Sequence, residues 1–359
     1  MNNMVSKIIS WLDERFDTKE IVHFISKKTV PVHRHSIWYY FGGVSLFFFI
    51  IQIFTGILLL FYYKGSADIA FESVKFIMSK VEFGWLVRSI HAWAANLFIF
   101  SVFIHMFSVY FEKSYRRPRE LTWLTGVVLL FMSMAFGFSG YLLPWNKLAF
   151  FATKVGTDIV GSVPLVGEPL KIFLRGGNEV TDATLSRFFG FHVALFPGIF
   201  TFMLLFHLLL VQRQGMSEPL EFENEPSGEK KTMPFFPNFM LRDLLLWLIV
   251  LNVLAILAVF FPADLGEKAE LFASAPAGIR PEWYFLFMFQ ILKYLPSKIF
   301  FMEGEIFGIV MFSLAGLMWL LVPFWDRKSS QGRKNRLINY IGIMAVTIII
   351  VLTIVGWIS

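Results

Sequence analysis

The sequence predicts an all-α membrane protein with about seven transmembrane helices and additional helices at the membrane interface. Charged residues make up only 16% of the 359 residues, against roughly 25% in an ordinary soluble domain. Seven windows contain no Asp, Glu, Lys or Arg, and each is long enough for an apolar helix to cross about 30 Å of hydrocarbon. These windows are 37–63, 89–111, 121–146, 188–212, 244–263, 306–325 and 337–359. The pattern excludes a soluble enzyme, a nucleic-acid-binding domain and a disordered protein.

The charge pattern divides the chain into four parts. Residues 1–35 are charged and amphipathic, which predicts an N-terminal interfacial segment lying on the membrane. Residues 36–212 hold the first four apolar windows and predict a four-helix domain. A polar linker at 213–240 separates it from 241–359, which holds the other three windows. The segment 283–292 is apolar but too short to span a bilayer, so we expect it inside a partly buried outer loop.

Basic residues favour one side of the expected membrane. The loops on the side of the N-terminus hold 19 Lys and Arg residues, whereas the longer loops on the other side hold 12. Because cytoplasmic loops carry an excess of basic residues, we expect a cytoplasmic N-terminus. The net charge of +6 then belongs to loops at a membrane surface and indicates no nucleic-acid partner.

The sequence contains no cysteine. The chain therefore cannot form a disulfide, hold an iron–sulfur cluster through cysteine or attach a haem through a thioether bond. Any metal centre must use histidine, methionine, tyrosine or carboxylate ligands.

Four of the seven histidines lie inside apolar windows at two similar spacings. His91 and His105 are fourteen positions apart in the second window, and His192 and His207 are fifteen apart in the fourth. Both offsets return to the same helix face within roughly 40° to 60° and separate the histidines by about 21 to 22 Å. The second and fourth spans run in the same direction, which places His91 level with His192 and His105 level with His207. Two such pairs suit bis-histidine ligation of two b-type haems, one outer and one inner, in a dihaem four-helix bundle.

Other readings of these histidines exist. A polar residue inside a membrane also packs between helices or lines a proton path. A single intramembrane histidine favours those roles, whereas two matched pairs on parallel helices favour haem ligation. His23, His33 and His35 show no spacing signal, and we expect them at the surface or the membrane interface.

Glycines repeat with the period of the histidines. Gly42 and Gly56 in the first span are fourteen positions apart, as are Gly126 and Gly140 in the third. Each glycine costs a helix interior about 0.8–1 kcal/mol relative to alanine. We expect Gly42 and Gly126 at the inner histidine level and Gly56 and Gly140 at the outer one. There the missing side chains clear space for a planar ligand; close packing between helices is the alternative.

Two further residues lie near the histidines. Arg88 precedes His91 by three positions, where it can pair with a haem propionate or anchor the helix at the interface. Pro197 lies between His192 and His207. Because proline lacks a backbone N–H, we expect it to bend the fourth span.

These features resemble cytochrome b of the quinol–cytochrome c oxidoreductases, the cytochrome bc family. The resemblance covers almost the whole chain and includes RPRELTWLTGV at 117–127, GYLLPWN at 140–146 and PEWYFLFMFQIL at 281–292. The sequence is similar to the chloroplast and cyanobacterial type, with its four-span cytochrome b and three-span subunit IV fused in one chain. That type attaches an extra haem through a cysteine just before a Gly-Gly pair. Residues 39–43 here read YYFGG, which excludes a covalent third haem.

The resemblance implies an outer quinol site at Pro281, Glu282, Trp283 and Tyr284, faced by Tyr141. Glu282 is the expected proton acceptor, because burial among apolar neighbours raises the pKa of a carboxyl group. Capping of the following helix is its alternative role. The implied reaction oxidises quinol outside, passing one electron to a Rieske iron–sulfur protein and on to a c-type cytochrome subunit. The other electron crosses the two b haems to an inner quinone site, whose residues the sequence does not assign.

The resemblance further implies a multi-subunit, proton-translocating enzyme in the bacterial plasma (inner) membrane, and a homodimer. The residues alone leave two other functions open. A dihaem membrane anchor of a respiratory dehydrogenase would keep the histidines but have no use for the outer PEWY motif. A haem-free transporter would need a substrate or ion pathway near the bilayer midplane.

Overall fold

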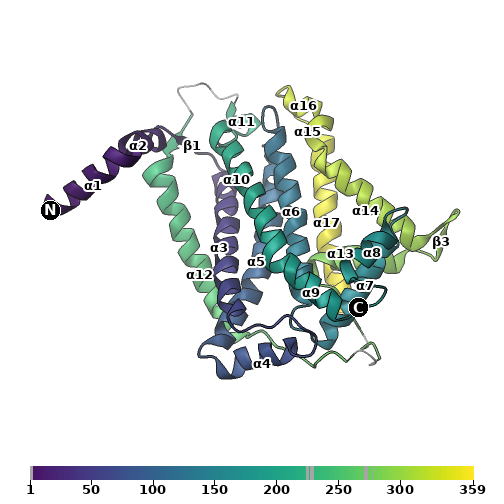
Figure 1. Cartoon of the computed structure of the whole chain (residues 1–359). Coiled ribbons are helices and arrows are strands. Elements are labelled where there is room, and N and C mark those ends of the chain that lie inside the picture. Colours follow the sequence, from purple (N-terminus) through teal and green to yellow (C-terminus); the bar gives the residue numbers. More distant parts are fainter. Residues whose placement is uncertain (1–2, 224–225, 227–229, 271–273, 277) are drawn as a thin grey trace.

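The computed structural model describes residues 3–223, 226, 230–270, 274–276 and 278–359. In this part of the chain the fold is almost entirely helical (Figure 1). Two short antiparallel pairs of strands complete it. Strand β1 (Thr29–Pro31) pairs with β2 (Thr232–Pro234), and β3 (Lys298–Ile299) pairs with β4 (Met302–Glu303).

Six of the described helices are long and apolar enough to cross a membrane, and a seventh apolar helix of 17 residues is shorter. The first span is Ser36–Leu60, which consists of η1 (Ser36–Tyr39) and α3 (Tyr40–Leu60). The second span is α5 (Gly84–Phe111), and the third is α6 (Glu120–Tyr141). The fourth is Asp182–Gln214, which joins α9 (Asp182–Gly190), η2 (Phe191–Leu195) and α10 (Phe196–Gln214). The fifth joins η3 (Phe235–Phe239) to α12 (Met240–Phe260), and α14 (Gly304–Leu320) and α17 (Arg336–Ile358) follow.

The sequence predicted about seven spans, and α14 is the one that falls short of the usual length. Its expected window reached residue 325, but the helix ends at Leu320 and a separate turn, α15 (Val322–Trp325), follows. Pro323 lies at the start of that turn and cannot donate a backbone hydrogen bond to continue α14. Seventeen residues span about 26 Å, slightly less than the hydrocarbon thickness of about 30 Å.

The remaining helices are short and lie at the ends of the bundle. They are α1 (Asn3–Phe16), α2 (Thr18–Ser26), α4 (Ala70–Lys80), α7 (Lys147–Gly161), α8 (Gly167–Arg175), α11 (Leu220–Glu223), α13 (Trp283–Tyr294) and α16 (Arg327–Ser330). The expected N-terminal interfacial segment forms α1 and α2, which branch away from the bundle (Figure 1). The apolar run 283–292 forms most of α13. The expected linker contains α11 and β2, and residues 224–225 and 227–229 of it lie outside the described residues.

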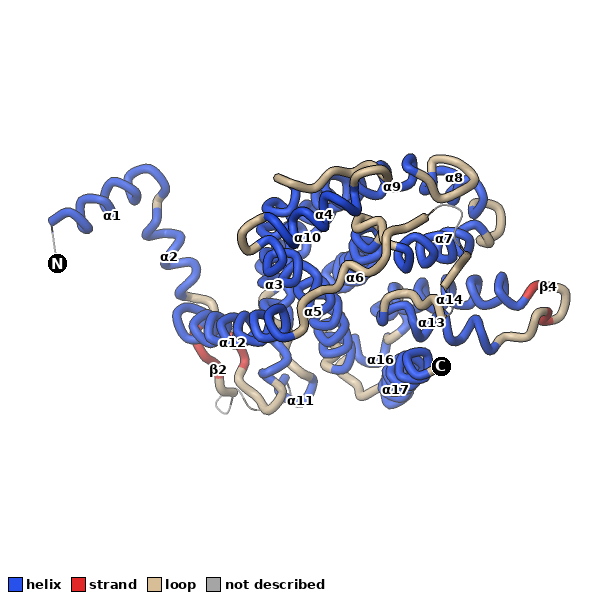
Figure 2. Tube along the Cα trace, turned by 90° about the horizontal axis from the view of Figure 1, so that it is seen from below, coloured by secondary structure: helices blue, strands red, loops and turns tan. Residues whose placement is uncertain are grey.

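Helices α3, α5, α6 and α10 form a central bundle (Figures 1 and 2). Within it α3 packs on α5 and α6 packs on α10, while α12 covers α3 and α5 from one side. On the other side α13 packs against α17 and α14. Because successive spans alternate in direction, α5 and α10 run parallel, which is the arrangement that the histidine argument requires.

The core of the bundle is aromatic at mid-height. Phe49, Phe98 and Phe200 are buried together there, and the Phe49 and Phe200 rings lie 4.6 Å apart. The outward faces of the spans instead carry large exposed apolar side chains, such as Phe54, Phe202 and Leu245. Because this apolar surface covers helices long enough to cross a bilayer, we assign it to contact with lipid, and the chain is a multi-pass membrane protein.

Candidate functional site

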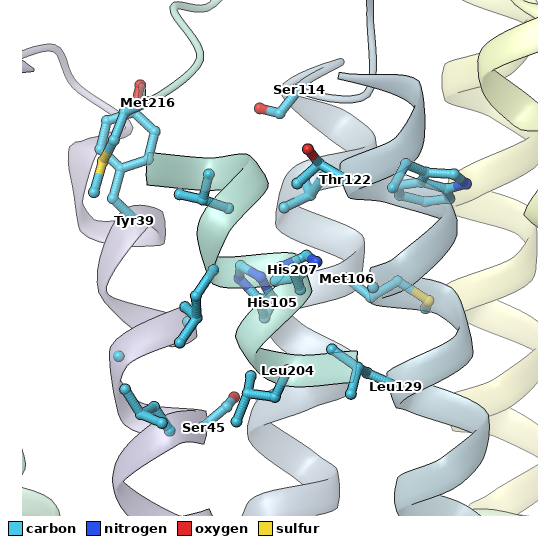
Figure 3. Close-up of a pocket in the computed structure, with 18 of the residues that line it drawn as sticks. Tyr39, Ser45, His105, Met106, Ser114, Thr122, Leu129, Leu204, His207 and Met216 are labelled. Carbon is cyan, nitrogen blue, oxygen red and sulfur yellow. The ribbon is translucent and has the colours of Figure 1, made fainter. Parts of the chain in front are cut away.

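The four intramembrane histidines meet in two pairs. The ring centres of His91 on α5 and His192 in η2, the turn that continues into α10, lie 6.3 Å apart at an interplanar angle of 76°. His105 and His207, from the same two helices, lie side by side and line one cavity (Figure 3). The structure thus brings together the pairs that the spacing predicts. Their role as haem ligands stays a prediction.

Hydrogen bonds fix which nitrogen of His91 carries the proton. Thr55 Oγ1 lies 2.8 Å from His91 Nδ1 and donates its own proton to the Ile51 carbonyl at 2.7 Å. A hydroxyl has one proton to donate, so the Thr55 oxygen accepts from His91 Nδ1–H. The Nε2 lone pair therefore points into the bundle without a proton, which is the state a metal-ligating imidazole needs.

Two other histidines are held in the same way. Thr125 Oγ1 lies 2.9 Å from His207 Nδ1 and donates to the Leu121 carbonyl. Ser139 Oγ lies 3.2 Å from His192 Nδ1 and donates to the Phe136 carbonyl. Among the described residues, His105 Nδ1 is buried and has no hydrogen-bond partner.

Each of the four repeated glycines packs against one imidazole ring. A Cβ atom on the glycine would lie close to Cε1 of the histidine: 3.2 Å for Gly42 and His105, 3.4 Å for Gly56 and His91, 3.3 Å for Gly126 and His207, and 2.6 Å for Gly140 and His192. The glycines therefore lie at the expected levels. The space that each one leaves lies beside an imidazole ring, and clearance of a planar ligand stays a prediction.

A π-helical turn explains why the second pair of histidines along the chain is spaced one position wider than the first. The turn η2 (Phe191–Leu195) contains His192 and ends two positions before Pro197, which cannot donate the α-helical bond to residue 193. A π turn holds one more residue than an α turn. It takes up the extra residue, so His192 and His207 face the same side of their helix, as His91 and His105 do. We expected Pro197 to bend the fourth span, and the feature that the structure has beside it is this π turn.

The inner histidine pair lies in the wall of a cavity of about 710 Å³. One part of it lies inside the four-helix bundle, and another reaches between α3, α10 and α12 as far as Asp243. Arg119 also lines the cavity, and its Nε is buried without a partner among the residues described. Sequence reasoning counted Arg119 only as loop charge, although it follows His105 at the same fourteen-position interval as the histidines and glycines.

Arg88 has other partners than the expected one. Its guanidinium donates to the backbone carbonyls of Ala263 and, at 2.8 Å, Asp264. These bonds hold the loop after α12 against the outer end of α5. Pairing of Arg88 with a haem propionate stays a prediction.

The PEWY residues form a half-buried group at the other end of the bundle. Trp283 Nε1 donates to Asn96 Oδ1 of α5 at 2.8 Å, which fixes the start of α13. The buried Tyr284 packs its hydroxyl directly against Gly137 of α6, a residue that sequence reasoning did not identify. Burial raises the pKa of Tyr284 well above its usual range, and the neighbouring Glu282 and Tyr141 add to that effect. Pro281, Glu282 and Tyr141 are half-buried beside it.

Glu282 is the N-cap residue of α13 by position, but its side chain makes no capping hydrogen bond. Burial raises the pKa of its carboxyl group. The capping role is thus not seen, while the raised pKa suits a group that takes a proton near neutral pH.

Comparisons with known proteins agree with this architecture. The family model described as cytochrome b/b6/petB matches residues 25–215, and the one described as cytochrome b (C-terminal)/b6/petD matches residues 272–359. The chain is 48% identical to a cytochrome bc complex cytochrome b subunit of Chlorobaculum thiosulfatiphilum over 347 residues, which cover 96% of this chain and 80% of that protein. It is 42% identical to cytochrome b6 of Rippkaea orientalis over 215 residues, which cover 60% of this chain and 96% of that one.

A solved structure titled hyperthermophilic respiratory Complex III contains a similar chain. It matches with a TM-score of 0.84 and 33% identity, over 97% of this chain and 91% of the other. Similarity of this extent, over nearly the whole chain, defines the class as a membrane electron-transfer subunit. The chain belongs to the cytochrome b/b6 family, as the sequence predicted.

The glycine contacts give a first testable expectation. In Gly140→Ala the new Cβ would overlap His192 Cε1, so we expect loss of the outer b-type component in a reduced-minus-oxidised spectrum. Gly56→Ala is the matched control, because its Cβ meets His91 at 3.4 Å, an ordinary contact. Both changes raise helix propensity by about 1 kcal/mol, so propensity cannot cause a difference between them. Equal spectra for the two variants would contradict the assignment of His192 to the outer b-type component.

Proposed function

We propose that the chain is the transmembrane electron-transfer subunit of a proton-translocating quinol:cytochrome c (or similar acceptor) oxidoreductase. It oxidises quinol at an outer site and returns one of the two electrons to quinone at an inner site. The observation that carries this proposal is the presence of two imidazole pairs, one at each of two levels of the bundle. In three of the four rings a hydroxyl oxygen accepts from Nδ1–H, which leaves Nε2 without a proton.

The residues around both pairs fit b-type haems. His91 and His192 would hold the outer haem, and His105 and His207 the inner one. Haem supplies one-electron transfer between the two levels when bound. The unpartnered Nε of Arg119, among the residues described, suits a carboxylate of the inner haem.

The outer site is built from the PEWY residues. Glu282 accepts a proton from the quinol hydroxyl, because burial raises the pKa of its carboxyl group toward the working pH. Tyr284 stays protonated at working pH and can donate a hydrogen bond to the same quinol oxygen. Trp283 donates to Asn96, which fixes the start of α13 and with it the backbone that carries Glu282 and Tyr284. Pro281 and Tyr141 form the adjacent walls.

The inner site lies in the part of the inner cavity between α3, α10 and α12. Gly43 of α3 packs directly against the carboxylate of Asp243 on α12, and Asp243 Oδ1 has no hydrogen-bond partner among the described residues. A buried acceptor of this kind, in an otherwise apolar cavity, suits a quinone that becomes a hydroxyl donor on reduction. The sequence did not identify these two residues.

Partners follow from the reaction. Quinol oxidation needs an iron–sulfur acceptor, and without cysteine this chain cannot hold the cluster, so a Rieske iron–sulfur protein and a c-type cytochrome subunit belong to the complex. We place the complex in a bacterial plasma membrane as a homodimer, with the N-terminus cytoplasmic. Family membership argues against a dehydrogenase anchor and against a haem-free transporter.

Histidine variants test the pairing. Replacing His105 or His207 by leucine should remove the inner b component, and replacing His91 or His192 the outer one, because each haem would lose one of the two histidines that would hold it. Spectra and redox titration of the purified complex measure this. If loss of His91 and of His207 removed the same component, the pairing would be wrong.

Haem attachment can be tested separately. With no cysteine for a thioether bond, all haem should leave the polypeptide on acid–acetone extraction. Haem staining of this chain after denaturing electrophoresis would contradict the assignment of two non-covalent b haems.

The pH dependence of turnover tests Glu282. A base with a raised pKa loses its proton only at higher pH, so outer quinol oxidation should rise as pH increases through that raised pKa. Glu282→Gln keeps the shape but cannot take the proton, and we expect turnover slowed by roughly 10- to 10⁴-fold and a flattened acid limb between about pH 5.5 and 9. The haem spectra should be unchanged.

Glu267→Gln is the matched control, because this outer carboxylate is 81% exposed and pairs with Lys147. It should behave like the wild type. Wild-type turnover in Glu282→Gln over the same pH range would remove Glu282 from the mechanism.

A further inference from the structure

A carboxylate lines the inner cavity at the end of α5. Glu112 is the C-cap residue of that helix, seven positions after His105, and forms part of the wall of the cavity. Its side chain is only 17% exposed. The carboxylate therefore lies where it can exchange a proton with a molecule bound in the cavity.

His35 connects Glu112 to the aqueous phase. His35 Nδ1 lies 3.8 Å from Glu112 Oε1, and the histidine side chain is 40% exposed. Arg34 Nε donates to His35 Nε2 at 2.7 Å, which leaves the ring proton on Nδ1, the nitrogen that faces Glu112. The separation exceeds hydrogen-bond length, and ion pairs of partly exposed groups contribute little to stability. The pair is therefore a weak structural tie, but it places two titratable groups in sequence between water and the cavity.

Other charged and titratable groups lie near this pair. His33 Nε2 lies 2.8 Å from Tyr39 Oη, which donates to the Ser217 carbonyl at 2.6 Å, and His33 Nδ1 accepts from the His35 backbone N–H. Lys113 Nζ lies 4.7 Å from the Tyr110 ring centre, over its face. The other groups nearby are Arg34, Arg119 in the cavity wall, and Glu218, which pairs with Lys230.

We propose that His35 and Glu112 form the proton-entry route to the inner quinone site. This inference rests on the proposed function, in which quinone is reduced in the inner cavity. The sequence treated His35 as a surface residue and did not identify Glu112. Neither is one of the four intramembrane histidines or one of the hydroxyl residues that hold them.

The proton balance is simple. Reduction of a quinone to a quinol takes two electrons, which come from quinol oxidised at the outer site, and two protons from the inner aqueous phase. A proton from the inner aqueous phase first binds His35 Nε2, where it replaces the hydrogen bond from Arg34 Nε. The Nδ1–H bond of the resulting imidazolium then breaks as that proton moves to the Glu112 carboxylate, which leaves a neutral imidazole. The O–H bond of Glu112 then breaks as an O–H bond forms at a quinone oxygen, which returns Glu112 to its starting state.

The test uses the purified complex with the full chain carrying Glu112→Gln. After one turnover of quinol oxidation, the rate at which quinone reoxidises the inner b component is followed by absorbance, and proton uptake by a pH-indicator dye. We expect both to slow together by about 10- to 100-fold, at the low end of the effect of a lost acid–base group, with unchanged haem spectra. His35→Asn should slow them less, since water still reaches Glu112. A small weak acid such as acetic acid, which carries protons into the cavity, should restore the rate.

Glu120→Gln is the matched control, because Glu120 lies on the same side of the protein, pairs with Arg117 at 3.4 Å and does not line the cavity. It should match the wild type. Two results would overturn the inference: a Glu112→Gln rate within about twofold of wild type, or a slower rate that follows a changed potential of the inner b component and is not restored by weak acid. If quinone failed to reoxidise any b component in the wild type, the proposed function itself would fall.

Discussion

Each of the four imidazole rings packs beside a glycine on a neighbouring helix, in the space that a side chain would occupy, which we call a glycine notch. These contacts set the distances between the helices of the central bundle. Both histidines of α5 face glycines of α3, and both histidines of the fourth span, His192 in η2 and His207 in α10, face glycines of α6. The bundle therefore consists of two helix pairs, α3 with α5 and α6 with α10, and the imidazoles of one pair face those of the other. A Cβ atom at Gly42, Gly126 or Gly140 would come closer to the facing ring than an ordinary contact, so the positions of those three imidazoles depend on the missing side chain, whereas the contact at Gly56 would be ordinary.

A short sequence pattern accompanies each notch. The residue before the glycine supplies the hydroxyl for the facing histidine at Thr55-Gly56, Thr125-Gly126 and Ser139-Gly140, but the fourth notch is Phe41-Gly42. His105 is the ring that lacks a partner there, among the residues described. An acceptor on Nδ1–H raises the basicity of Nε2, and the structure shows such an acceptor for the other three rings. The two levels of the bundle therefore differ in their chemistry.

Much of this arrangement could be predicted from the sequence, because it depends on distances along single helices. The charge-free windows locate the spans, and the repeats of four helical turns place histidines and glycines at the same levels. Contacts between segments that are distant in sequence could not be read in this way. The bonds from Arg88 to residues 263–264 depend on where the loop after α12 lies, and the contact of Gly43 with Asp243 depends on how α12 packs on α3. The π turn at 191–195 was not predicted either. The fifteen-residue offset between His192 and His207 indicates an extra residue only if both histidines are required to lie on the same face of the helix.

The buried aromatic layer at mid-height also has an electrical consequence. Phe98 lies seven positions from both His91 and His105, so the layer fills the gap between the two imidazole levels, which are about 21 Å apart along the helix. That gap is roughly two-thirds of a hydrocarbon thickness of about 30 Å. Moving one elementary charge across a whole membrane costs about 2.3 kcal/mol per 100 mV, so transfer between the levels would cost about 1.5 kcal/mol per 100 mV. The spacing of two histidines on one helix thus sets how strongly the membrane voltage opposes the electron that crosses it.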